Sequence, residues 1–415
     1  MIFKFVILTY YFIIECNRYL RHKTPKNIVN IETMSLTIRS FLNLLKATPV
    51  TSPTVRIVCG NESADLDSVA SAISYAYFKF IENSRDAQPF IPIINIPRED
   101  LKLRRDIVHV LKDININEDL LFFIDDMKKW KQENKNIEAV LVDHNEVVNE
   151  AKKYINKVIG IIDHHKDMGL YMDASPRIIQ VCGSCTSLVY SHFINDVLPQ
   201  SYTPMHDVTQ LCLAAGLSDT TSFNHRVESP DLVCKELYRK FADDIDMEKY
   251  TKVIKNAKND ITGFTARDLL RKDYKQFVFT NNNKSINNGE LIMGISSIVK
   301  SMDWLYEEFG GASALKQDCV KYRIEKNVDI LTIMTSFVEK GKFQRQITMI
   351  PSDETKTIAE EIITKVTDYL KLDNSNVNVL NNDGSNEKLQ QFKQQNIDAS
   401  RKQVAPYLGK AFEEL

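Results

Sequence analysis

Residues 158–167 read Val-Ile-Gly-Ile-Ile-Asp-His-His-Lys-Asp, and the fold is decided by this stretch. Its apolar residues run directly into Asp163, His164 and His165, which predicts a buried strand that ends in one carboxylate and two imidazoles. Ligands bind at the carboxyl ends of the strands in an open parallel sheet. Neighbouring side chains of a strand point in opposite directions, so we expect one imidazole to face a metal and the other a substrate. Taken alone, the stretch also fits a chance tripeptide at the start of a loop.

A second apolar segment, residues 55–59, also leads into polar side chains. The loop Gly60-Asn61-Glu62-Ser63-Ala64-Asp65-Leu66-Asp67-Ser68 follows it, and residues 69–77 are predicted to be helical. Two carboxylates two positions apart, Asp65 and Asp67, are suited to hold two neighbouring divalent cations. The alternative is that Asp67 or Ser68 only caps the helix, which would explain one of these residues but not the whole run.

Two more elements end in the same way. The apolar segment 139–142 is followed by Asp143, His144 and Asn145, and the predicted helix 208–217 leads to Asp219. A carboxylate at the C-terminal end of a helix gains nothing from the helix dipole, so a ligand role suits Asp219 better than a capping role. We therefore expect several metal ligands to lie together at one edge of a sheet.

The order of the predicted elements indicates the fold class. Strands and helices alternate through residues 34–230, which predicts an α/β domain with a Rossmann-like parallel sheet. Residues 231–260 are charged and are expected to form a helical connector. Residues 261–415 contain longer, mixed elements and are expected to form a smaller α+β domain. Its predicted strands are 277–279, 291–295, 328–336 and 345–350, and residues 374–386 are expected to be an Asn-rich loop.

Composition limits the class of protein. The 415 residues are 43% hydrophobic and 26% charged with a net charge of −2, which suits a globular protein of two or three domains. Nothing in this balance favours nucleic acid or a membrane surface, and we expect a monomer without either partner. The seven cysteines are an odd number in mostly apolar segments, which predicts reduced thiols in the cytoplasm. Cys182 and Cys185 lack a second pair to complete a zinc site.

The first sixteen residues are apolar but short for a helix that crosses a membrane, and no small-residue cleavage site follows them. Met34 is a plausible alternative start, so residues 1–33 are interpreted as an extension outside the fold. Membrane or organelle targeting by this extension stays open.

Four segments, GNESADLDS, LVDHNE, IIDHH and LSDTT, resemble in order the motifs of the DHH phosphoesterase superfamily. The segments LLRKDYKQF and ASRKQVAPYL are similar to the C-terminal domain of family II inorganic pyrophosphatases. Within that branch the chain is most similar to exopolyphosphatases of the fungal cytosolic type. One departure from the pyrophosphatase pattern is Asn61, which stands where those enzymes have a histidine ligand. An amide oxygen suits a hard cation, so the resemblance implies that Mg²⁺ is tolerated relative to Mn²⁺ or Co²⁺.

The resemblance implies a site with two divalent cations in the cleft between the domains, with water as the nucleophile. The implied metal ligands are Asn61, Asp65, Asp67, Asp143, His164 and Asp219, with Asp67 and His164 on the same cation. His165 would contact or protonate the phosphate, and Asp163 would orient the imidazoles. The implied phosphate-binding residues are Lys275, Arg401 and Lys402, with Arg226 and Arg271 equally compatible with a solvated surface.

The activity implied is exopolyphosphatase, which releases orthophosphate from the end of inorganic polyphosphate. The alternatives are an inorganic pyrophosphatase, a phosphodiesterase acting on short nucleotides, and a non-catalytic protein that binds polyanions. Arg104 and Arg105 are compatible with a solvated helix face.

Overall fold

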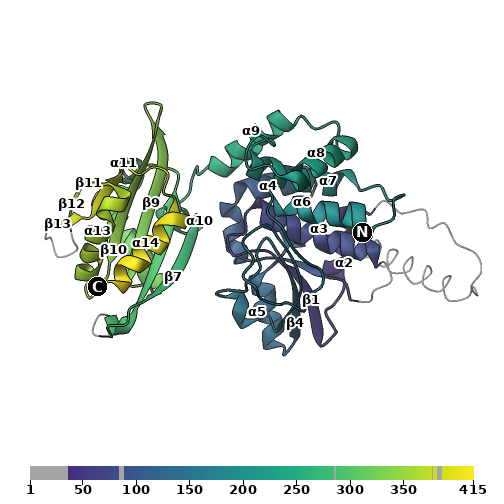
Figure 1. Cartoon of the computed structure of the whole chain (residues 1–415), viewed down its shortest axis with the longest axis horizontal. Helices are drawn as coiled ribbons and strands as arrows, with labels where there is room; N and C mark the ends of the chain where they lie inside the picture. The colour runs from purple at the N-terminus through teal and green to yellow at the C-terminus, as the bar shows by residue number, and fades with distance from the viewer. Residues whose placement is uncertain (1–35, 84–87, 285–286, 376, 381–385) are drawn as a thin grey trace, which may run out of the picture. The chain divides into compact units, whose positions relative to one another are not determined.

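The computed structural model describes residues 36–83, 88–284, 287–375, 377–380 and 386–415 (Figure 1). Thr37–Leu415 form one compact unit. The interpretation of residues 1–33 as an extension lies outside the described residues. Within the described ranges, no helix has the length and apolar character that crossing a membrane requires.

The N-terminal half contains a six-stranded sheet in the order β3-β2-β1-β4-β5-β6, and all of its neighbouring strands are parallel. Most residues in its central strands are buried, as expected for a parallel sheet with helices on its faces. This confirms the predicted α/β class. The strands are β1 Thr54–Cys59, β2 Ile91–Ile94, β3 Phe122–Phe123, β4 Asn136–Val142, β5 Lys157–Asp163 and β6 Arg177–Ile179.

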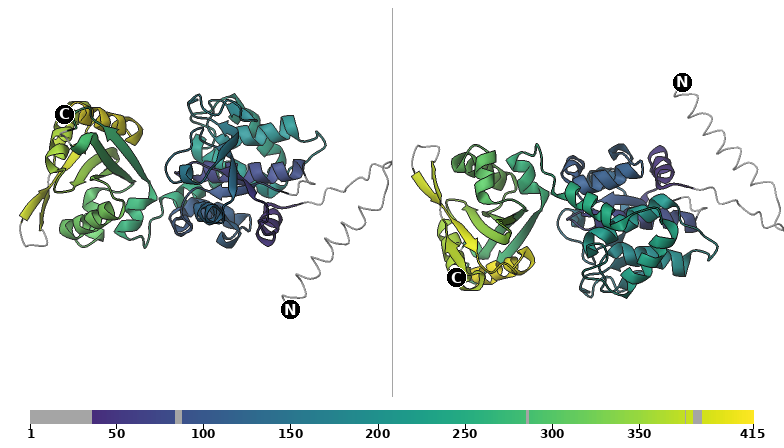
Figure 2. Two further views of the ribbon diagram at one scale, coloured as in Figure 1. Left: turned by 90° about the horizontal axis from the view of Figure 1, so that it is seen from below. Right: turned by 90° about the horizontal axis from the view of Figure 1, so that it is seen from above.

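Helices connect and cover these strands (Figures 1 and 2). The central one is α3, Leu66–Glu82, which is buried from residue 66 to residue 78 and packs on β1, β2, α6 and α7. The others are α2 Ile38–Ala47, α4 Arg105–Asp113, α5 Ile124–Gln132, α6 Cys185–Ser191, α7 His206–Thr220, α8 Ser229–Phe241 and α9 Met247–Asn259. Short helical turns occur at η1 Arg98–Leu103, η2 Glu118–Leu120, η3 Ala151–Lys153 and η4 His192–Val197.

The C-terminal half contains a second six-stranded sheet in the order β11-β14-β10-β9-β8-β7. Only β8 and β9 are parallel, which confirms the expected α+β character. The strands are β7 Tyr274–Thr280, β8 Glu290–Ile298, β9 Ile330–Glu339, β10 Lys342–Pro351, β11 Leu372–Asn374 and β14 Gln391–Gln394. The helices are α10 Ala266–Lys272, η5 Asn287–Gly289, α11 Met302–Glu308, α12 Ala312–Glu325, α13 Lys356–Leu370 and α14 Arg401–Glu413.

Two apolar cores hold these helices to opposite faces of the second sheet. Alternate residues of β9 face in opposite directions, so Ile330 packs with α13 and α14 while Leu331 packs with α10, α11 and α12. The alternation of side chains along β9 therefore assigns its apolar residues to one core or the other.

One predicted loop contains strands. Residues 374–386 include β12, Val377–Leu380, which pairs antiparallel with β13, Asn386–Leu389. The prediction was wrong here because the high Asn content concealed the β-branched Val377 and Val379, which alternate with polar residues. The helix on which Arg104 and Arg105 were expected to form a solvated face is interrupted, because η1 ends at Leu103 and α4 begins at Arg105.

Candidate metal centre

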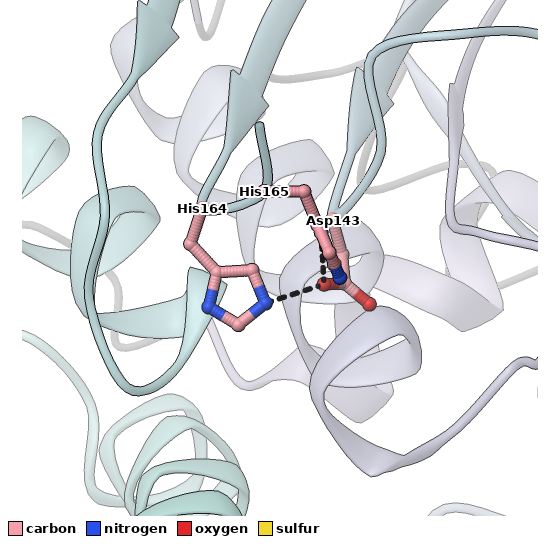
Figure 3. Close-up of side chains that lie close together, drawn as sticks. All are labelled: Asp143, His164 and His165. Carbon is pink, nitrogen blue, oxygen red and sulfur yellow. Dashed lines mark ion pairs between the residues drawn. The ribbon is translucent and has the colours of Figure 1, made fainter. Parts of the chain in front are cut away.

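Three adjacent strands deliver the candidate ligands to one edge of the first sheet. Strand β4 lies between β1 and β5, and Asp143 and His164 directly follow β4 and β5 (Figure 3). Asp143 has a φ of 62°, a left-handed conformation that is uncommon outside glycine. Such backbone conformations cost about 1–3 kcal/mol and concentrate at functional sites, which favours a ligand role for Asp143.

Asp143 is the centre of a compact group of donor atoms. Its Oδ1 lies 3.1 Å from Nε2 of His164 and 3.8 Å from Nδ1 of His165. Nε2 of His164 also lies 3.9 Å from Oδ2 of Asp67. Asp67 and Asp143 are 1% and 2% exposed, so solvent screens their negative charges only weakly.

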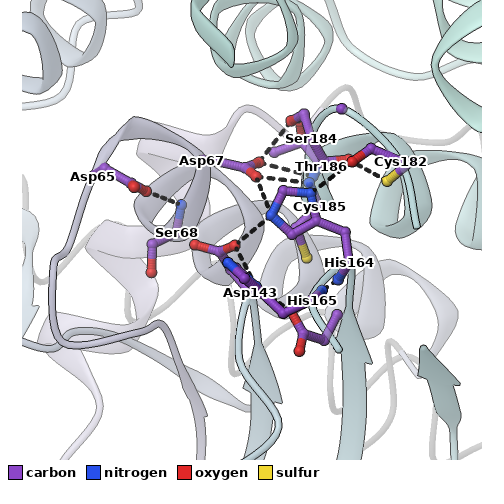
Figure 4. A network of polar contacts seen from close by, with 12 residues as sticks. Asp65, Asp67, Ser68, Asp143, His164, His165, Cys182, Ser184, Cys185 and Thr186 are labelled. Atoms are coloured by element: carbon purple, nitrogen blue, oxygen red, sulfur yellow. Dashed lines mark hydrogen bonds and ion pairs between the residues drawn. The ribbon is translucent and has the colours of Figure 1, made fainter. Parts of the chain in front are cut away.

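Asp67 is held by the start of helix α6 and not by its own helix (Figure 4). Its carboxylate accepts hydrogen bonds from the Ser184 hydroxyl at 2.7 Å, from the Cys185 amide at 2.6 Å and from the Thr186 amide at 2.9 Å. Asp65 is the residue that caps α3, because its Oδ1 accepts from the Ser68 amide at 3.1 Å. Capping therefore explains Asp65 but not Asp67.

The two imidazoles have different partners. Nδ1 of His164 donates to the carbonyl of Cys182 at 3.0 Å, which leaves Nε2 directed at Asp143. Nδ1 of His165 contacts Oδ1 of Asp163 at 2.8 Å, and the side chain of His165 is 46% exposed. Backbone carbonyls and carboxylates commonly orient metal-binding histidines in this way. His164 is thus arranged to bind a cation, and His165 is open to a substrate.

Asp163 is fully buried and organises this corner of the site. It accepts hydrogen bonds from the backbone amides of His164 and His165 and from the side chain of Asn145. Burial alone would raise the pKa of Asp163, but the contacts with His165 and Asn145 hold that pKa below its usual range. Asn145 also accepts from the Met168 amide, so it links β4 to the loop after β5. Sequence reasoning noticed Asn145 but assigned it no role.

Asn61 has an arrangement that sequence reasoning did not anticipate. Its Oδ1 accepts hydrogen bonds from Ser63 and from the Ala64 amide, and its Nδ2 donates to the Asp143 carboxylate. The amide oxygen that was predicted to bind a cation is therefore engaged within the loop. In this arrangement Asn61 orients Asp143.

The electrostatics of the cluster favour cations. Burial raises the pKa of Asp67, Asp143 and Asp219, and the neighbouring carboxylates raise each of them further. Burial would lower the pKa of His164, but its contacts with Asp143, Cys182 and Asp67 raise it to about 12. Asp219, in the last turn of α7, belongs to the same group of carboxylates, because the negative charges of Asp67 and Asp65 raise its pKa. Carboxylate oxygens with one imidazole suit Mg²⁺ or Mn²⁺, so the residues fit divalent cations.

The predicted phosphate-binding residues differ in solvent exposure and in whether an acidic side chain already pairs with them. Arg401, the first residue of α14, donates to the backbone and the carboxylate of Asp273. Lys402 and Arg226 are exposed, and Lys275 is half-buried on β7.

Arg271 is placed differently from the prediction. Its side chain is 4% exposed and forms ion pairs with Glu99 at 2.9 Å and Asp100 at 2.7 Å. This geometry argues against a substrate role, because the guanidinium is enclosed by carboxylates.

Arg104 and Arg105 do not form a solvated face. Arg104 donates to the carbonyls of Ser63 and Lys272, and Arg105 pairs with Asp260. Ser63, Arg104 and Lys272 also line a cavity of about 290 Å³ that reaches Asp65 and Lys258. The partners of Arg104 could not be predicted from the sequence, because backbone carbonyls leave no signal there.

Comparison with known proteins identifies related chains. Residues 56–217 match the N-terminal domain of the DHH family, and residues 252–411 match the DHHA2 domain. A candidate exopolyphosphatase of Schizosaccharomyces pombe is 31% identical over 379 residues, which cover 88% of this chain and 93% of that protein.

More distant relatives carry two kinds of name. Exopolyphosphatase PRUNE1 of Bos taurus is 26% identical over 72% of this chain and 64% of its own length. A manganese-dependent inorganic pyrophosphatase of Methanothrix thermoacetophila is 26% identical over 68% of this chain and 86% of its own length. Among solved structures, a candidate family II inorganic pyrophosphatase of Methanococcus jannaschii has a TM-score of 0.53 at 19% identity, covering 86% of this chain and 99% of that one. With its two matched domains and a relative aligned over nearly its full length, the chain belongs to the DHH family.

Proposed function

We propose that the chain is a metal-dependent exopolyphosphatase that removes orthophosphate from the end of inorganic polyphosphate. The observation that carries the proposal is the cluster of Asp67, Asp143 and His164 at the sheet edge, in which both carboxylates are buried. A cluster of this kind suits divalent cations, and the names of the S. pombe and PRUNE1 relatives supply the substrate.

The residues that would hold the cations are Asp65, Asp67, Asp143, His164 and Asp219. When bound, two divalent cations withdraw charge from the phosphoryl oxygens and lower the pKa of water. Asp143 lies among these residues, and its carboxylate would supply negative charge and oxygen ligands at the centre of the group. The α6 amides keep the Asp67 carboxylate in place, and the Cys182 carbonyl keeps Nε2 of His164 directed inward.

The protein's own groups would act on the phosphate as well. His165 is held through Nδ1 by Asp163 and has its ring half exposed, so its Nε2 can donate a proton to the leaving phosphate oxygen. Lys275, Arg401 and Lys402 supply positive charge for the phosphates that follow in the chain. No covalent intermediate with the protein is required.

Inorganic pyrophosphatase is the second candidate. It is favoured by the manganese-dependent relatives and by the fold of the solved neighbour. The same metal chemistry would serve both reactions, so only the substrate distinguishes them.

A side-by-side substrate panel tests the proposal. Purified protein is given polyphosphate, pyrophosphate, a nucleoside tetraphosphate and a short linear dinucleotide, each with Mg²⁺ and with Mn²⁺. Orthophosphate release is measured for the first three substrates and mononucleotide release for the dinucleotide. We expect polyphosphate to give the highest kcat/KM. A preference for pyrophosphate would establish the second candidate. Absence of metal-dependent turnover on all four would favour a non-catalytic protein that binds polyanions.

A further inference from the structure

Asp231 is a fully buried carboxylate that the proposed chemistry does not use. It lies in the first turn of α8, and its two oxygens divide four donors between them. Oδ2 accepts from the Gly183 amide at 2.7 Å and from the Glu228 amide at 2.9 Å. Oδ1 accepts from the Ser187 hydroxyl at 2.7 Å and from the Ser184 amide at 3.3 Å. Helix capping accounts for the contact with Glu228, while the other three contacts reach a different part of the chain.

Those three contacts hold the segment that positions two predicted ligands. Residues 182–186, named here the 182–186 turn, present the Cys182 carbonyl to Nδ1 of His164. The same turn presents the Ser184 hydroxyl and the two following amides to Asp67. Asp67 and His164 are also the two residues expected to share one cation, so a shift of this turn would move both ligands together.

Gly183, within this turn, is packed without spare room. A Cβ on Gly183 would lie 2.4 Å from Cγ2 of Thr220 and 2.6 Å from the carbonyl of Arg226. Thr220 is next to Asp219, at the end of α7. Oδ2 of Asp231 lies 3.1 Å from the same Cβ position, so Asp231 and the end of α7 together enclose the turn at Gly183.

We propose that Asp231 is a positioning residue for the cation site formed by Asp67 and His164. The inference rests on the proposed metal centre but not on the identity of the substrate. Asp231 does not touch a cation itself. It keeps the 182–186 turn in the position from which its groups hold the Asp67 carboxylate and Nε2 of His164 close together.

The substitution Asp231→Asn tests this role with a nearly unchanged shape. Asparagine has one acceptor oxygen, so its NH₂ group must face either the Gly183 and Glu228 amides or the Ser187 and Ser184 donors. In the first orientation the NH₂ group meets two amide donors, and in the second the Ser187 hydroxyl can rotate to accept while the Ser184 amide loses its acceptor. Either orientation therefore removes at least one contact that holds the turn. Partners that orient metal ligands typically contribute roughly 10–100-fold to metal affinity. Mn²⁺ is titrated into the protein without substrate, and binding is monitored by electron paramagnetic resonance. We expect Asp231→Asn to bind Mn²⁺ roughly tenfold more weakly than the unaltered protein at the site of Asp67 and His164, with little change at the other cation site.

Two further variants complete the design. Asp126→Asn is the matched control, because Asp126 occupies the same position in the first turn of α5 and accepts from the Phe123 amide at 2.8 Å. Its Mn²⁺ affinities should match those of the unaltered protein. Ser187→Ala removes a single donor to Asp231 and should weaken the same site by a smaller factor, which covers the case in which Asp231→Asn does not fold.

Three results would overturn the inference. The first is folded Asp231→Asn protein with both Mn²⁺ affinities within twofold of the unaltered protein. The second, if that variant does not fold, is an unchanged Mn²⁺ affinity in Ser187→Ala. The third is an absence of Mn²⁺ binding by the unaltered protein, which would overturn the metal centre as well. Binding of Mn²⁺ without turnover of polyphosphate would refute the proposed substrate and leave the role of Asp231 intact.

Discussion

Replacement of Asp143 by asparagine tests the centre of the proposed site. Oδ1 of Asp143 faces His164, and its Oδ2 accepts from the Asn61 amide, whose orientation is fixed by Ser63 and Ala64. An asparagine at this position must direct its NH₂ group either toward the cation or against the NH₂ group of Asn61. Removal of one partner from a buried charged pair costs about 3–5 kcal/mol. If the cost falls on the transition state, turnover should decrease by roughly two to four orders of magnitude, at 1.36 kcal/mol for each factor of ten.

The assay is orthophosphate release from polyphosphate at saturating Mn²⁺, with circular dichroism as the test of folding. Asp126→Asn serves again as a control for the chemical change of carboxylate to amide, at a position that follows the outer strand β3 and contacts Phe123 and Arg98. Near-normal turnover of folded Asp143→Asn at saturating metal would refute the assignment of Asp143 as a central ligand.

The remaining predictions concern the chain start, the substrate and one buried lysine. A protein that begins at Met34 should unfold at the same temperature and have the same rate as the full chain, and loss of either property would contradict the interpretation of residues 1–33 as an extension. Hydrolysis should proceed from a chain end, so early gel samples should contain orthophosphate and slightly shortened polymer, whereas abundant mid-length fragments would show internal cleavage. Charge reversal at Arg401 should raise the KM for polyphosphate more than it weakens Mn²⁺ binding, because a guanidinium binds phosphate but no cation, and the opposite ranking would reject the phosphate role. Burial lowers the pKa of Lys272 to about 8, so the unfolded chain binds this proton more tightly than the folded chain does. The free energy of unfolding should therefore rise between about pH 8 and 9.5 by about 1.5 kcal/mol relative to Lys272→Met, and equal pH profiles of the two proteins in denaturant titrations would contradict it.

The sequence was sufficient to predict the class of each half of the chain. Apolar runs that end in Asp143 and His164 mark strands whose carboxyl ends share one sheet edge, so their proximity follows from parallel pairing alone. The β12–β13 pair was missed because strand formation there depends on pairing between two short segments that are individually rich in polar residues.

Individual side-chain partners were harder to predict. Arg271 was a candidate for phosphate binding because it is basic. In the fold, however, it pairs with Glu99 and Asp100 from η1, more than 170 positions earlier in the chain. A pairing of this kind depends on how the connector leads into α10, and no local pattern in the sequence encodes that path. Asn61 shows the same limit at short range, because the choice between its oxygen and its nitrogen depends on the loop conformation at Ser63 and Ala64.

Backbone groups contribute most of the contacts that set the direction of the two best-oriented ligands. The Cys182 carbonyl directs His164, and the Cys185 and Thr186 amides direct Asp67. Backbone groups are present at every position, so these three contacts do not depend on the side chains of Cys182, Cys185 and Thr186 as long as the path of the turn is kept, whereas the contact from the Ser184 hydroxyl to Asp67 does depend on its side chain. What fixes that path is the fit of Gly183 against Thr220 together with the carboxylate of Asp231. The metal affinity of this centre should consequently be more sensitive to the residues that enclose the turn than to the side chains of Cys182 and Cys185, which are buried thiols.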